Sequence, residues 1–160
     1  FRITAPMLFK DFVVSEAQIE LASSLGTDAI LLIAKALNAK SLDVFIRHSL
    51  ARGLEPLVEL HDEQDLAKLS ACKDFKSVKL VGINSRDLRS FETDFTKVQG
   101  LKSLLPPGRI VIAESGVRSS EDLVSLEGFD AVLIGNLFMR AEDIEAEVAR
   151  TVSACRSVAK

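Results

Sequence analysis

Charged and amide side chains follow several apolar, β-prone runs of this chain, each where the run ends and a helical stretch begins. Lys10 follows the first such run, Glu59 follows Leu57-Val58, Asn84 follows a third run and Glu114 ends a fourth. A lysine and a carboxylate can supply a general acid and a general base. The loops after the strands of a parallel α/β barrel converge on one rim, so we expect these side chains to surround one ligand.

Lys10 and Glu59 are the acid–base candidates. Lys10 lies beside Phe9 and Phe12, and these apolar surroundings would suit it to act as a general acid. Glu59 would act as a general base or stabilise a developing iminium cation. The alternatives are a solvated surface lysine and a glutamate that caps a helix or forms a salt bridge, although Asp62 lies nearer the next helix.

Asn84 and Arg86 could bind polar groups of a ligand. An asparagine amide both donates and accepts hydrogen bonds, so it can orient a hydroxyl or a carboxylate. An arginine can grip a carboxylate through two parallel bonds. The alternative is that Asn84 shapes a turn and that Arg86 pairs with Asp87.

Two glycine turns follow the last two apolar runs. Glu114 and Ser115 precede Gly116, and Gly135-Asn136 repeats the pattern. Glycine lets backbone N–H groups approach a ligand closely, and barrels often bind phosphate at the loops after their final two strands. We therefore expect a phosphate site at these turns, the alternative being that they only reverse the chain.

The histidines and cysteines predict no further site. His48 lies in a helical stretch and is expected to pack or to face solvent, and His61 is expected to be a loop residue. Cys72 and Cys155 stand outside any CxxC or metal-ligand spacing, so we expect two reduced thiols and no metal.

Composition favours one globular domain that acts on small molecules. The 160 residues carry a formal net charge of −3 with acids and bases intermixed, which does not suit a nucleic-acid surface or a polybasic membrane patch. The longest apolar runs, such as residues 29–34, are far shorter than the roughly 20 residues that cross a bilayer. No signal peptide is visible, so we expect a cytoplasmic protein, or a plastid one from a plant or alga.

Apolar runs alternate with stretches of helical period along the whole chain. This alternation predicts a parallel sheet covered by helices, with right-handed crossovers. Gly26, Gly53 and Gly128 are placed to end helices before strands. The predicted strands are residues 5–9, 29–34, 55–60, 77–83, 109–113 and 130–134, and the predicted helices are residues 16–25, 39–52, 63–71, 96–104, 120–126 and 144–158.

An internal repeat suits a barrel of equivalent βα units. Gly26-Thr27-Asp28-Ala29 and Gly128-Phe129-Asp130-Ala131 each introduce an apolar strand. Six units are predicted, whereas the closed parallel barrel has eight. Because the first residue is Phe1, we expect either that two units precede it in a longer product or that a partner completes the sheet. The predicted fold of residues 1–160 is a single, partial (β/α)8-barrel domain.

Taken together, these motifs resemble indole-3-glycerol phosphate synthase, in the order and spacing of that family. The resemblance runs from about Pro6 to Arg140, on residues 8–12, 28–33, 57–63, 82–88, 113–116 and 133–135. It implies a (β/α)8 barrel of which this chain holds strands three to eight. It also implies a carboxy-lyase of tryptophan biosynthesis that acts on 1-(2-carboxyphenylamino)-1-deoxyribulose 5-phosphate. Ring closure, loss of carbon dioxide and dehydration would proceed without metal or organic cofactor.

The resemblance also implies roles for individual residues. Lys10 would be a general acid at the substrate carbonyl, Glu59 an acid or base in the dehydration, and Asn84 a residue that holds the substrate. Glu114 and Ser115 would contact hydroxyls and the anthranilate end. The implied substrate-binding residues, with Phe12 packing on a ring and the glycine turns holding phosphate, are Phe12, Arg86, Gly116, Leu133, Gly135 and Asn136.

The chain departs from the family pattern in two places. Asn136 stands where the family usually has Ser or Glu, and the glutamate and lysine of the family's first strand and the serine of its second are not in these residues. The implied partners are a sugar-phosphate substrate and an amino-terminal segment or a fused tryptophan-pathway domain. The alternative functions are another phosphate-binding barrel enzyme, such as phosphoribosylanthranilate isomerase, and a truncated, non-catalytic remnant that binds phosphate ligands or a partner chain.

Overall fold

The computed structural model describes residues 4–86 and 94–158, which divide into two compact units. Unit 1 comprises Phe1–Gly82 and Leu105–Ile110, and unit 2 comprises Ile83–Leu104 and Val111–Lys160. Each unit has its own helices, strand ends and buried apolar residues. The single-domain organisation predicted from the sequence stays a prediction, because this division describes internal compactness and not independent folding.

Six strands form one sheet in which hydrogen-bonded neighbours follow the order of the sequence, from β1 to β6. The pairs β1–β2, β2–β3 and β5–β6 are parallel. Helices connect most successive strands, which confirms the predicted α/β class and the incomplete parallel barrel. The strands are β1 (Leu8–Phe9), β2 (Ala29–Ile33), β3 (Glu55–Leu60), β4 (Leu80–Asn84), β5 (Ile110–Glu114) and β6 (Ala131–Leu133).

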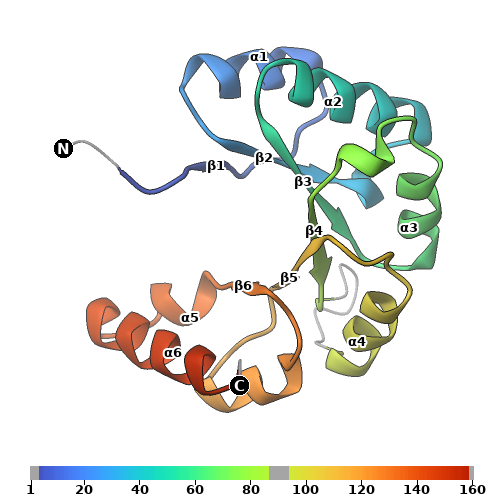
Figure 1. The fold of residues 1–160 in the computed structure, drawn as a ribbon. Helices are drawn as coiled ribbons and strands as arrows, with labels where there is room; N and C mark the ends of the chain where they lie inside the picture. The colour runs from blue at the N-terminus through green and yellow to red at the C-terminus, as the bar shows by residue number, and fades with distance from the viewer. Residues whose placement is uncertain (1–3, 87–93, 159–160) are drawn as a thin grey trace. The chain divides into compact units, whose positions relative to one another are not determined.

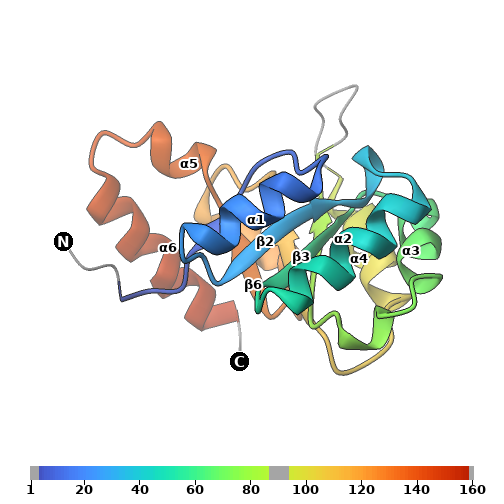
Figure 2. The same ribbon diagram turned by 90° about the horizontal axis from the view of Figure 1, so that it is seen from above.

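Three α-helices of unit 1 cover its strands (Figure 1). They are α1 (Glu16–Ser24), α2 (Ala39–Ala51) and α3 (Glu63–Ser70). Helix α2 contacts α1, α3, β2 and β3, and Figure 2 shows α1 and α2 side by side over β2. Asn38 and Asp62 cap α2 and α3 by accepting a backbone N–H of the first turn, which fixes where these helices begin.

The strands of unit 1 belong to its buried core. Ile30 and Leu32 of β2, and Val58 and Leu60 of β3, have no accessible surface. Neighbouring positions along these strands are buried as well, because helices or other residues cover both faces of the sheet. The predicted bounds of β3 match the structure, although β3 includes Glu55 and Glu59, and those of the unbroken apolar run β2 differ by one residue.

Unit 2 packs its helices on one another around buried Val98, Leu101, Leu123 and Leu126. Its helical segments are α4 (Phe95–Ser103), the 3₁₀ helix η3 (Ser120–Leu126), α5 (Asn136–Met139) and α6 (Ile144–Val158). The η3 segment contacts both α4 and α6.

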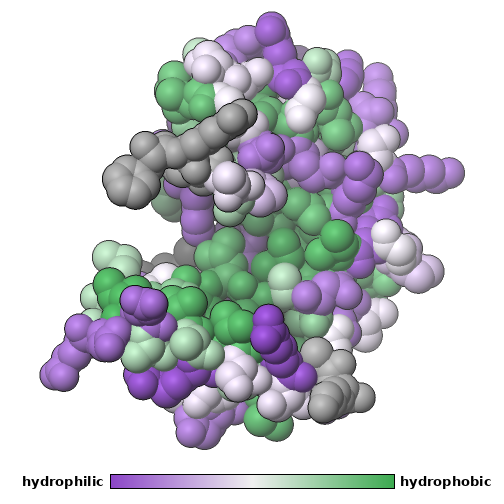
Figure 3. Space-filling view, turned by 60° about the vertical axis from the view of Figure 1, so that its left-hand side comes forward, coloured by the Kyte–Doolittle hydropathy of each residue, from purple (hydrophilic) through white to green (hydrophobic). Residues whose placement is uncertain are grey.

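Hydrophobic residues also reach the surface, as Figure 3 shows in green. Ile144, Val148 and Val152, spaced by four residues along α6, are all exposed. None of the helices in the described ranges has both the length and the apolar composition that a bilayer crossing requires.

The structure corrects several predicted elements. Strand β1 has two residues instead of five, because Met7 already bonds to the turn before β2 through its backbone N–H and carbonyl. Strand β4 begins at Leu80, after a short 3₁₀ helix η2 (Phe75–Ser77). The centroid of the Phe75 ring in η2 lies 4.0 Å from the guanidinium carbon of Arg109. The segment 120–126 is a 3₁₀ helix instead of an α-helix. The sequence did not predict α5 or the 3₁₀ helix η1 (Ala34–Ala36), both of which are short.

Candidate active site

Lys10 and Glu59 lie at the carboxyl ends of strands β1 and β3, which flank β2 in unit 1. Lys10 directly follows β1, and Glu59 is the penultimate residue of β3, in register with Ile33. Because the three strands are parallel, both residues belong to the same edge of the sheet, across two strand spacings of about 4.8 Å each. Lys10 is exposed and Phe12 is 63% exposed, so the apolar surroundings predicted for Lys10 are not found.

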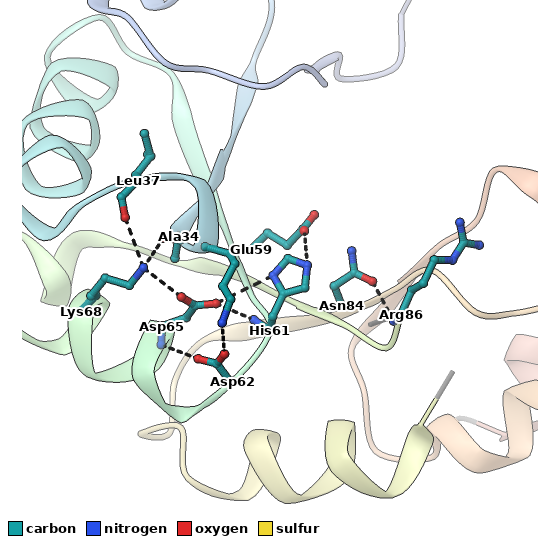
Figure 4. Close-up of polar contacts among 10 residues, drawn as sticks. Ala34, Leu37, Glu59, His61, Asp62, Asp65, Lys68, Asn84 and Arg86 are labelled. Atoms are coloured by element: carbon teal, nitrogen blue, oxygen red, sulfur yellow. Dashed lines mark hydrogen bonds and ion pairs between the residues drawn. The ribbon is translucent and has the colours of Figure 1, made fainter. Parts of the chain in front are cut away.

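Glu59 is buried beside His61. The Nε2 atom of His61 lies 3.2 Å from Oε1 of Glu59 (Figure 4), although neither ring nitrogen is aligned for a hydrogen bond. Burial lowers the pKa of His61 from 6.5 and outweighs the carboxylates of Glu59 and Asp65, which raise it. The imidazole next to Glu59 is therefore neutral at pH 7.

Asp65, in the first turn of α3, holds the other side of His61. Its Oδ2 accepts the backbone N–H of His61 at 3.0 Å and lies 3.8 Å from Nδ1 of the ring. Its Oδ1 lies 3.0 Å from Nζ of Lys68, which also donates to the carbonyls of Ala34 and Leu37. Only 1% of the surface of Asp65 is exposed, and these contacts, drawn in Figure 4, supply the partners that its buried carboxylate needs.

Asp62 has the capping role that the sequence predicted for it. Its Oδ1 accepts the backbone N–H of Asp65 at 3.0 Å, and its Oδ2 pairs with Lys35. Burial raises the pKa of Asp62, whereas the hydrogen bonds from Lys35 and from the backbone N–H groups of Asp65 and Gln64 lower it. The hydrogen bonds together outweigh burial, so the pKa of Asp62 is lowered from its ordinary value. Asp62 is therefore a structural carboxylate that fixes the start of α3.

In unit 2, hydrogen bonds join the carboxyl ends of three strands. Glu114, the last residue of β5, is in register with Leu133, the last residue of β6. The backbone N–H of Ser85, just after β4, donates to the Glu114 carbonyl at 2.9 Å, and the Ser115 N–H donates to the Leu133 carbonyl at 3.3 Å. The predicted residues after β4, β5 and β6 are thus gathered at one edge of this unit.

Ser115 and Gly116 form a turn in the left-handed backbone region. Their φ angles are 66° and 83°, and Ser115 is the sole non-glycine residue with positive φ in the described ranges. This conformation is costly for a residue with a side chain and persists where other contacts hold it. Ser85 supplies such a contact, because its hydroxyl donates to the Ser115 carbonyl at 3.0 Å and to the Glu114 carbonyl at 3.2 Å.

Asn84 and Arg86 are joined by a local turn. The side-chain oxygen of Asn84, the last residue of β4, accepts the backbone N–H of Arg86 at 2.9 Å (Figure 4). The turn-forming alternative for Asn84 is therefore correct for its amide oxygen. The alternative pairing of Arg86 with Asp87 lies outside the described residues, since Asp87 belongs to the segment 87–93.

The second glycine turn follows β6, as predicted. Gly135 precedes α5, whose first residue is Asn136, and both residues are exposed. The carbonyl of Gly135 accepts the backbone N–H of Met139 at 3.0 Å. Gly135 has a φ of −122°, outside the positive range in which glycine is favoured.

Sequence reasoning missed two contributors. His61 lies in the loop between β3 and α3, as expected, but it is 6% exposed and in contact with Glu59, which was not predicted. Ser85 was not assigned a role, yet it ties β4 to the turn after β5. The spacing of His61 and Asp65, four residues apart across the start of α3, was the available signal. Within the described ranges, no group of three or more His, Cys, Asp or Glu residues could hold a metal ion.

Comparison with known proteins decides the family. A family model described as indole-3-glycerol phosphate synthase matches residues 2–151, which is most of the chain. The chain belongs to the indole-3-glycerol phosphate synthase family. The enzyme of that name from Campylobacter curvus is 47% identical over 150 residues, covering 92% of this chain and 56% of that protein. The synthase from a Geobacillus strain is 36% identical over 159 residues, covering 98% of this chain and 60% of that protein. The chain therefore spans little more than half the length of these synthases.

Solved structures support the barrel fold. The 3-hexulose-6-phosphate synthase of Salmonella typhimurium aligns with a TM-score of 0.71 at 14% identity, covering 96% of this chain and 74% of that one. The thiamine phosphate pyrophosphorylase of Pyrococcus furiosus aligns with a TM-score of 0.69 at 13% identity, covering 89% of this chain and 66% of that one. At such low identity these similarities establish the fold alone, whereas the family rests on the closer sequence relatives.

Proposed function

We propose that this chain supplies the strand-three-to-eight part of an active site that forms indole-3-glycerol phosphate. The substrate would be 1-(2-carboxyphenylamino)-1-deoxyribulose 5-phosphate, and the products would include one carbon dioxide and one water. The observation that carries the proposal is that buried Glu59 shares the carboxyl edge of the unit 1 strands with exposed Lys10, in a chain of this family. A carboxylate and an ammonium group on one edge suit a reaction that needs an acid and a base.

The residues of unit 1 take the proton-transfer steps. Lys10 is exposed, so its ammonium group is open to a ligand and can donate a proton to the substrate carbonyl during ring closure. Glu59, held in a buried setting, exchanges a proton in the dehydration step. Phe12, 63% exposed after β1, offers a ring face to the aromatic end of the substrate.

The residues of unit 2 take the binding steps. The glycine turns at Gly116 and at Gly135-Asn136 bring backbone N–H groups to the phosphate, beside Leu133 at the end of β6. Asn84 and Arg86 hold polar groups of the substrate. Glu114 and Ser115, at the end of β5, contact its hydroxyls and the anthranilate end, and the hydroxyl of Ser85 keeps their turn in shape.

The proposal extends to partners and compartment. The reaction as written uses no cofactor and no metal, and its one ligand is a sugar phosphate. We also propose a cytoplasmic setting, which the free thiols of Cys72 and Cys155 support. An amino-terminal segment that completes the barrel, or a fused domain of the same pathway, stays a prediction.

The decisive experiment joins this chain to the first two βα units of the Campylobacter curvus relative. The purified chimera would be incubated with the substrate, and indole-3-glycerol phosphate would be detected by its fluorescence. We expect turnover by the chimera and its loss in the Glu59→Gln version. A chimera with native circular dichroism that forms no product would reject the proposal, and equal turnover by both versions would reject the role of Glu59.

A further inference from the structure

Three ionisable side chains form a buried row from the end of β3 into α3, all within unit 1. Glu59, His61 and Asp65 are 4%, 6% and 1% exposed. The imidazole stands between the two carboxylates, 3.2 Å from Glu59 Oε1 and 3.8 Å from Asp65 Oδ2. Water screens the charges of such a buried row only weakly, so a change of charge on one side chain strongly alters the electrostatic energy of its neighbour.

The row is held firmly at one end. Asp65 accepts the backbone N–H of His61 at 3.0 Å and pairs with Lys68 at 3.0 Å, and Lys68 also donates to the carbonyl of Leu37 at 3.2 Å. Asp65 therefore cannot turn away from the imidazole without breaking several contacts. Asp65 thus holds the backbone of His61, and the Nε2 atom of the ring faces Glu59.

We propose that His61 is a positioning residue for Glu59: anchored by Asp65, its imidazole keeps the Glu59 carboxylate in the orientation that the reaction requires. The inference rests on the role of Glu59 proposed above. The 3.2 Å between Nε2 and Oε1 is within hydrogen-bonding range, so a hydrogen bond would form once an Nε2–H is aligned with Oε1. The residue acts through Glu59 and not on the substrate.

The charges that face His61 explain why it suits this task. Glu59 on β3, Asp65 on α3 and Asp62 before α3 raise the pKa of the ring, and Lys35 on η1 lowers it. Burial is the largest effect and lowers the pKa below its ordinary value. A neutral ring can donate to the Glu59 carboxylate without locking it into an ion pair, which leaves Glu59 able to exchange protons.

The contact can be tested in the full chain, without any turnover. The imidazole of His61 would be titrated by NMR in the wild type and in Glu59→Gln. Removing the carboxylate that raises the pKa of His61 should lower its titration midpoint further. An unchanged His61 midpoint would overturn the inference.

The functional part is tested in the chimera described above. His61→Leu keeps an apolar volume but has no donor, and His61→Asn keeps a donor. We expect His61→Leu to lower kcat by about 10- to 100-fold with little change in KM, and His61→Asn to recover part of the loss. If either variant unfolds, circular dichroism will show it, and the other variant then decides. If the folded His61 variants keep the wild-type kcat while Glu59→Gln is inactive, the inference is overturned and the proposed function stays intact. Full turnover in Glu59→Gln would instead overturn the proposed role of Glu59.

Discussion

The carboxylate of Asp28 accepts a hydrogen bond from the backbone N–H of Met7 at 2.7 Å, and the Asp28 N–H returns one to the Met7 carbonyl at 2.9 Å. Asp130 makes the same pair of bonds with Val111, at 2.8 Å and 3.0 Å. Each aspartate directly precedes a strand, β2 in unit 1 and β6 in unit 2, and ties it to the strand before it in the chain. The repeated sequence around Asp28 and Asp130 is therefore a repeated structural joint.

Removing this joint at either position should destabilise the chain. Asp28→Ala should lower the free energy of unfolding by about 1 kcal/mol, the usual net contribution of one hydrogen bond. Asp28→Asn should lose less, because its side-chain oxygen can still accept the Met7 N–H. The same ranking is expected at Asp130. Urea unfolding followed by far-ultraviolet circular dichroism measures both, and Ala variants as stable as the wild type would show that the joint contributes nothing.

His61 should make the chain less stable in mild acid. Burial lowers the pKa of His61 in the folded chain from 6.5. Below about pH 6.5 the unfolded chain therefore binds a proton at His61 more readily than the folded chain does. The free energy of unfolding should therefore fall as the pH decreases from about 6.5 towards the folded-state pKa, and the contribution is fully present at higher pH. Urea titrations near pH 7 and near pH 5 should show a smaller difference in His61→Gln than in the wild type. An identical difference in both proteins would contradict this assignment.

The two cysteines should differ in reactivity. Burial, with the nearby carboxylates of Asp43 and Asp74, raises the pKa of the Cys72 thiol from 9.0 to about 11. Because the thiolate is the reactive form, Cys72 in the folded chain should be alkylated about a hundredfold more slowly than a free thiol. Cys155 is only half-buried and should react first. Mass spectrometry of the iodoacetamide-treated chain measures both rates, and equal rates in urea provide the control. Equal rates in the folded chain would show that Cys72 is not protected.

Much of the fold could be predicted because its strands are buried on both faces. β2 is an unbroken apolar run, and the glycines that end the preceding helices have the positive φ that their positions require, such as 71° for Gly26 and 75° for Gly53. The start of α3 followed from Asp62, whose side chain caps the helix locally. Prediction was weaker where a contact from elsewhere in the chain decides the local structure, as Asp28 does for Met7.

The candidate site shows the same limit. The positions of Lys10, Glu59 and Glu114 at strand ends follow from the order of apolar runs and need no knowledge of tertiary contacts. The role of Ser85 was missed because its hydroxyl binds carbonyls about 30 residues later in the chain. His61 was missed because burial, and not residue type, makes it a partner of Glu59.

Loss of the acid or base should reduce turnover and leave the fold intact. In the chimera, Lys10→Ala and Glu59→Gln should each lower kcat by at least about 100-fold, the usual contribution of a positioned acid or base. Lys40→Ala, at an exposed position of α2, and Glu63→Gln, at an exposed position of α3, are the matched controls and should retain activity. Steady-state kinetics at saturating substrate measure kcat. Wild-type turnover in both Lys10→Ala and Glu59→Gln would remove them from the mechanism.

A side chain at Gly135 should weaken substrate binding without disturbing the fold. A Cβ built at Gly135 meets no atom within 4 Å beyond its chain neighbours, and its φ of −122° is outside the positive range that side chains avoid. Gly135→Val should therefore fold normally but block the approach of phosphate to the turn. Losing one charged hydrogen bond should raise KM by about 10- to 100-fold, with a smaller effect on kcat. Gly100→Ala, in α4 and equally open around its Cβ, is the control and should leave KM unchanged. If KM of the folded Gly135→Val chimera equals that of the wild type, the phosphate binds elsewhere.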